Sequence, residues 1–212
     1  MNLLLTNPQK IYIASLVALI LLTILLVGIF LFKRLYPKKH YKEATYLVLS
    51  KLAKNEDYLL LNHFRINYDD THVGVIDHIL ISKKYIFVIN DFPLSGVISG
   101  EMKDRSLRLV KGKKEINNIS NPLNYNINLI KRLNLYHRLD KDLVKGLVVV
   151  NNDAAVNMSR VGDQFIIIRR KELKKTIKSF DKDNVKNLKE DEIVNFINKL
   201  DRENRKRDYD QK

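Results

Sequence analysis

The 212-residue chain contains no cysteine, so disulfide bonds and cysteine-ligated zinc or iron–sulfur centres are excluded. A metal ion would have to be bound by carboxylates or histidines. None of the five histidines forms the i, i+4 pair that places two zinc ligands on one face of a helix. The sequence has no internal repeat and no phosphate-binding loop, since Gly96 and Gly100 indicate only a turn. Carboxylates are therefore the main candidate ligands.

No charged residue occurs between Ile11 and Phe32, a run of 22 residues. A helix of this length matches the hydrocarbon core of a membrane, which is roughly 30 Å thick. A cleaved signal peptide is the alternative, but its apolar core would be only about 7–15 residues long and would end in a small-x-small site, which is missing here. The run therefore predicts an uncleaved transmembrane helix.

The charges that flank this run differ on its two sides. Lys10 and the amino terminus precede it, whereas Lys33, Arg34, Lys38 and Lys39 follow it. The positive-inside rule then predicts a single-pass protein of the cell membrane with its C-terminal part in the cytoplasm. The expected parts are an extracytoplasmic segment at 1–10, the span at 11–32, a basic linker at 33–40, a cytosolic domain at 41–200 and a charged tail at 201–212.

The formal net charge is +14, which favours an anionic partner. Clustered lysines and arginines bind nucleic-acid phosphates, but a domain held against an anionic leaflet gains from the same charge. Residues 33–42 are the best placed to contact lipid, and Lys38, Lys39 and Lys42 are interpreted as a solvated face beside the membrane. No aromatic residues interleave with the charges as they would for stacking on bases. The membrane, nucleic acid and another protein all stay open as partners.

Periodicity predicts an α/β fold, with helices around a mixed sheet. Apolar residues at helical spacing, such as Leu47, Val48 and Leu52, predict a helix over Tyr41–Lys54. The predicted strands are Tyr58–Ile66, Val73–Ser82, Tyr85–Asn90, Gly146–Val150 and Gln164–Ile168, with a short hairpin within Gly96–Val110. Further helices are predicted from Asn121 onward and over Glu190–Leu200.

An acidic residue, Asp77, stands in the middle of the second predicted strand, among apolar neighbours. A charge in that position is costly unless a metal ion, a partner or water meets it. One interpretation is a metal ligand. The other is that Asp77 lies at a sheet edge or pairs with a lysine or arginine of this basic domain. The sequence leaves both open.

Several short segments resemble, in their order and spacing, the nuclease-related (NERD) domain family. They are Glu43, Val75-Ile76-Asp77-His78, Phe87-Val88-Ile89, Ser95-Gly96 and Asn121-Pro122, and the resemblance covers roughly Tyr41 to Val150. It implies a PD-(D/E)xK, restriction-endonuclease-like fold. In that fold an Asp on one strand and a Glu-x-Lys on the next hold Mg²⁺ and position the nucleophile for phosphodiester hydrolysis.

This chain departs from the family pattern at the positions that carry the chemistry. Counting back from Ser95-Gly96, Asn90 stands at the Glu position and Phe92 at the Lys position, and Tyr125 replaces a Gln. Asn can offer only a neutral oxygen to a cation, and Phe can neither donate a hydrogen bond nor carry a charge. The resemblance therefore implies a vestigial catalytic set of Asp77, Glu43 and Asn90.

Neighbouring residues are the possible substitutes. Asp91 is one residue away, but it points to the other face of the strand unless a bulge near Pro93 intervenes. The metal ligands of an active site would be Asp77, Glu43 and Asp91, and a displaced cation would come from Lys83, Lys84 or Lys103. His78 is expected to be a hydrogen-bonded structural residue on the face opposite Asp77.

The leading hypothesis is a membrane-anchored, catalytically inactive NERD-like domain that binds nucleic acid or acts as a scaffold. No cofactor is expected in that case. One alternative is an active Mg²⁺-dependent nuclease with a rearranged site. Another is a protein-interaction module at the membrane that binds no nucleic acid.

Overall fold

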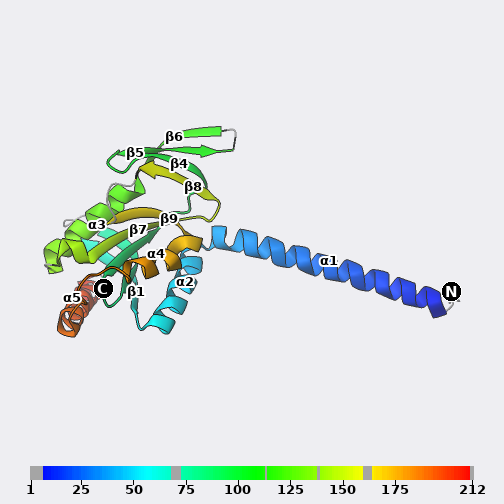
Figure 1. Ribbon diagram of the computed structural model, residues 1–212, viewed down its shortest axis with the longest axis horizontal. Helices are drawn as coiled ribbons and strands as arrows, with labels where there is room; N and C mark the ends of the chain where they lie inside the picture. The colour runs from blue at the N-terminus through cyan, green and yellow to red at the C-terminus, as the bar shows by residue number, and fades with distance from the viewer. Residues whose placement is uncertain (1–6, 68–72, 113, 138, 160–163, 211–212) are drawn as a thin grey trace. The chain divides into compact units, whose positions relative to one another are not determined.

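The computed structural model describes residues 7–67, 73–112, 114–137, 139–159 and 164–210, in two compact units, 1–40 and 41–212. The N-terminal unit is a helix, α1 (Asn7–Lys39) (Figure 1). It contains the stretch Ile11–Phe32, which is long and apolar enough to cross a membrane.

The second unit is built on a five-stranded sheet with the order β1-β2-β3-β7-β9. The first three strands are antiparallel, whereas β3, β7 and β9 run parallel to one another. The bounds are β1 (Leu59–Asn67), β2 (Val73–Ile81), β3 (Ile86–Asp91), β7 (Val144–Val150) and β9 (Phe165–Arg169). The predicted mixed sheet flanked by helices is confirmed.

Helices cover both faces of this sheet (Figure 1). On one face, α2 (Tyr41–Glu56) and α4 (Leu173–Phe180) pack on side chains such as Phe87 and Ile89. On the other, α3 (Pro122–His137) and α5 (Glu190–Asp210) pack with Val88. Successive side chains of a strand point to opposite faces, so every residue of β3 is buried. This double burial explains the continuous apolar runs in the sequence.

A second, four-stranded sheet has the order β6-β5-β4-β8. Its strands are β4 (Gly96–Glu101), β5 (Ser106–Lys111), β6 (Lys114–Ser120) and β8 (Ala154–Ser159). Gly96 has φ +108°, and a Cβ there would lie 2.3 Å from the carbonyl oxygen of Val110, so the start of β4 requires glycine. The sequence predicted only a hairpin here.

Two 3₁₀ turns complete the second unit: η1 (Lys141–Leu143) before β7, and η2 (Arg170–Glu172), which leads directly into α4. At the C-terminal end, α5 continues to Asp210, through most of the segment predicted to be a tail. That segment is highly charged, and its hydrophobic spacing ends near Leu200, so the sequence pattern gave no reason to extend the helix.

Candidate functional site

A pocket of about 360 Å³ opens where β2 and β3 separate. The sheet contributes Asp77, Asn90 and Asp91 to its wall, Phe92 follows directly after β3, α2 contributes Lys42, and α3 contributes Tyr125. The pocket therefore brings together three residues that the sequence predicted for the site, Asp77, Asn90 and Phe92. It also contains Lys42, which the sequence predicted on a face beside the membrane.

The pocket exists because the pairing of β2 with β3 ends at His78 and Ile89. Beyond that pair of residues, a side chain of β2 instead of a backbone carbonyl accepts a hydrogen bond from β3. The backbone N–H of Asp91 donates to Oδ2 of Asp77 at 2.9 Å. This hydrogen bond joins the ends of β2 and β3 and occupies one oxygen of the Asp77 carboxylate.

The other oxygen of Asp77 pairs with Lys42, whose Nζ lies 2.7 Å from Oδ1. Asp77 is only 4% exposed, so the carboxylate that Lys42 pairs with is almost completely shielded from water. The hydrogen bond to Asp77 raises the pKa of Lys42 above its ordinary value, and burial opposes that rise. This contact matches the second interpretation of Asp77, in which the carboxylate pairs with a basic residue. Lys42 is thus part of the pocket, whereas the sequence predicted only a solvated face beside the membrane.

The residues at the altered family positions turn toward Val75 and toward each other. Asn90 Nδ2 donates to the Val75 carbonyl at 2.9 Å, and the Tyr125 hydroxyl bonds both the N–H and the C=O of Val75 at 3.0 Å. The rings of Phe92 and Tyr125 meet edge to face with centroids 6.1 Å apart. Within the described ranges, Asn90 Oδ1 is buried without a hydrogen-bond partner.

Asp91 turns its side chain to the α2 and α4 side of the sheet. Its Oδ1 accepts from the hydroxyl of Thr45, and its Oδ2 lies 3.1 Å from His78 Nε2. Burial raises the pKa of Asp91, and its bonds to His78 and Thr45 oppose the rise. Nε of the buried Arg170 donates to Thr45 at 3.0 Å, which places a positive charge in the same network.

His78 also takes the structural place expected for it, on the face opposite the Lys42–Asp77 pair. Its Nδ1 lies 2.7 Å from Oδ1 of Asn62, the residue directly across on β1. The side chain is buried between this amide and Asp91. Both ring nitrogens are therefore committed to hydrogen bonds.

The other candidates lie outside the pocket. Glu43 is exposed on α2, and Lys103 forms an exposed ion pair with Glu101. Lys83 is exposed, and Lys84 Nζ donates to the carbonyls of Asp181 and Asp183 at 2.7 and 2.6 Å. Among the residues that the structure describes, no group of three or more His, Asp or Glu side chains could together hold a metal ion.

The family model for the nuclease-related domain, NERD, matches residues 39–151, more than half of the chain. The chain belongs to the NERD family. Searches of the curated proteins and of the solved structures returned no match. The resemblance seen in the sequence is therefore confirmed over nearly the same residues.

The NERD match extends from α2 to the end of β7. The strand β9 and the helix α4 lie beyond it, yet β9 completes the sheet and α4 packs into the same core as α2. Arg170 also lies beyond the match and reaches Thr45, which is 125 residues away in the sequence. No local pattern marks Lys42, Thr45 or Arg170, because their partners are set by the tertiary fold.

Proposed function

We propose that this protein is a membrane-anchored NERD domain that has lost the nuclease reaction and acts by binding. The observation that supports this most directly is the ion pair between Lys42 and Asp77. It places an ammonium group against the acid that, by the family resemblance, would bind Mg²⁺.

The residues present do not fit a magnesium site. Both oxygens of Asp77 already accept hydrogen bonds, from Lys42 and from the backbone of Asp91. A cation about 4 Å from Lys42 Nζ would be repelled by about 4 kcal/mol per unit charge at an effective dielectric of about 20. The unpartnered oxygen of Asn90 would be a single neutral ligand, too weak to offset that repulsion.

Membrane anchoring rests on the apolar stretch Ile11–Phe32 and on the charges that flank it. The basic residues after the span support a cytoplasmic NERD domain by the positive-inside rule. The domain then works at the inner surface of the cell membrane as a scaffold or a nucleic-acid-binding module.

A nuclease assay on the full chain in detergent tests the loss of activity. The purified protein is incubated with single- and double-stranded DNA and RNA in the presence of Mg²⁺ or Mn²⁺. We expect no cleavage above that of the Asp77→Ala variant. Metal-dependent cleavage that Asp77→Ala abolishes and Glu190→Ala retains would contradict the proposal and indicate a rearranged active site.

Nucleic-acid binding, measured in the same samples, distinguishes a nucleic-acid-binding module from a scaffold. Binding of nucleic acid that weakens steeply with salt would assign a nucleic-acid partner. Absence of nucleic-acid binding at low salt would favour the alternative of a protein-interaction module at the membrane.

A further inference from the structure

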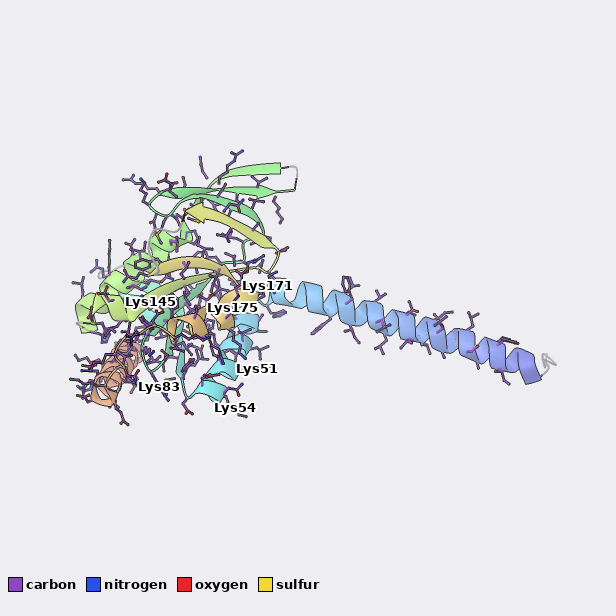
Figure 2. All side chains as sticks on the ribbon, in the orientation of Figure 1. Lys51, Lys54, Lys83, Lys145, Lys171 and Lys175 are labelled. Carbon is purple, nitrogen blue, oxygen red and sulfur yellow. The ribbon has the colours of Figure 1, made fainter. Side chains whose placement is uncertain are left out.

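Helices α2 and α4 pack side by side, and both present lysines on their outward sides. Their inward residues, such as Leu49 of α2 and Ile177 of α4, belong to one core cluster with the sheet. Figure 2 shows labelled lysines that extend from α2, from η2 and from α4. The exposed lysines that form this lysine surface are Lys51, Lys54, Lys171, Lys174 and Lys175.

Acids neutralise the lysine surface only in part. Glu56 pairs with Lys178 and also attracts Lys174, and Glu172 pairs with Arg169 and also attracts Lys171. None of the five lysines forms an ion pair with any residue that the structure describes. Exposed acids lie at the margins of this surface: Glu43 in the first turn of α2, Asp57 just after α2, and Asp153 next to Asn152, which accepts from the backbone N–H of Lys171. The surface therefore keeps an excess of positive charge.

Two large side chains with apolar parts are exposed among these lysines. Tyr46 is 44% exposed and Leu47 is 48% exposed. Leu47 lies one helical turn before Lys51, so an apolar contact and an ammonium group share one stripe of α2. A helix that exposes apolar and aromatic side chains among lysines has the composition of a membrane-interface contact.

Only a short stretch of chain separates the candidate span from the first helix of this surface. The candidate span ends at Phe32, α1 ends at Lys39 and α2 begins at Tyr41. Seven helical residues after the span rise about 10 Å, so the start of α2 stays near the headgroups. A tethered surface meets lipid at a high effective concentration, whereas nucleic acid must arrive by diffusion. The tether thus favours lipid as the partner of this surface.

We propose that the lysine surface, with Tyr46 and Leu47, docks on acidic lipid headgroups of the membrane in which the chain is anchored. This inference rests on the anchoring proposed above. Each lysine at an anionic membrane surface contributes about a fivefold gain in binding, so several lysines together hold the domain down. Leu47 and Tyr46 add the apolar contact that a purely electrostatic surface lacks.

Because the chain has no cysteine, a single introduced cysteine gives a site-specific fluorescent label. The full chain is reconstituted in nanodiscs that carry a headgroup-linked quencher, with either phosphatidylglycerol or only phosphatidylcholine. One label is placed at Asn55→Cys on α2. The other is placed at Leu135→Cys, which is exposed on α3 across the sheet. We expect strong quenching at position 55 only with phosphatidylglycerol, and weak quenching at position 135 with either lipid.

A charge-matched pair of variants tests the lysines themselves. The first removes four lysines of the surface, and the second removes four exposed lysines elsewhere. The first set is Lys51→Gln, Lys54→Gln, Lys174→Gln and Lys175→Gln, and the second is Lys111→Gln, Lys131→Gln, Lys186→Gln and Lys199→Gln. We expect the first to lower the docked-to-free ratio at least about tenfold and the second to change it less than about twofold.

Three results would overturn the docking proposal: equal quenching at both labels, quenching independent of lipid charge, or equal docking by the two variants. If lipid charge has no effect and the first variant instead loses binding to a DNA duplex, the surface belongs to nucleic acid. Failure of the chain to enter nanodiscs would instead count against the anchoring, because insertion depends on Ile11–Phe32 and not on these lysines.

Discussion

Replacement of Asp91 by alanine is expected to lower the unfolding free energy of the NERD domain by about 3–5 kcal/mol. Asp91 is buried and bonds Thr45 and His78, and its negative charge favours the charged form of Arg170. Arg170 is only 5% exposed. Without Asp91 its guanidinium would be buried with no anion beside it, which is the costliest way to break such a network.

Urea unfolding of the full chain in detergent, followed by far-ultraviolet circular dichroism, measures this loss. Glu190→Ala is the matched control, because Glu190 is an exposed acid in the first turn of α5, and we expect it to cost about 0.5 kcal/mol. A similar small loss for Asp91→Ala would mean that Asp91 is solvated, and its role as a buried structural residue bonded to Thr45 and His78 would be wrong.

The second large effect that we expect is a gain of metal binding by a variant of the pocket. A variant with Lys42→Ala, Asn90→Glu and Phe92→Lys removes the competing ammonium and adds a second carboxylate to the pocket. It also restores a lysine two residues further along the chain, where Phe92 lines the same pocket as Asn90. We expect it to bind Mn²⁺ with a Kd of about 1 mM or tighter, and the natural chain to bind at least about tenfold more weakly.

Isothermal titration of both proteins with Mn²⁺ measures the difference, and circular dichroism establishes that the variant is folded. The double variant Lys42→Ala and Asn90→Glu leaves Phe92 in its contact with Tyr125, and it serves if the triple variant does not fold. A folded variant that binds Mn²⁺ no better than the natural chain would show that these positions do not account for the missing metal site.

Strands buried on both faces could be predicted because their apolar runs are continuous, as in β3 and β7. The position of Asp77 within β2 and the opposite orientation of His78 followed from strand alternation. The small sheet was largely missed because its strands are short and mix polar with apolar residues, as in β6. The pairing of Lys42 with Asp77 and of Arg170 with Thr45 could not be predicted, since each joins distant segments through the tertiary fold.

The central claim is that Lys42 holds the place beside Asp77 where a nuclease of this family would hold its metal ion. A crystal structure of the full chain grown with Mn²⁺, with anomalous diffraction recorded for manganese, tests it most directly. We predict Lys42 Nζ within hydrogen-bond distance of Asp77 and no manganese peak in the pocket. A manganese ion about 2.1 Å from an Asp77 oxygen, with Lys42 displaced, would contradict the account.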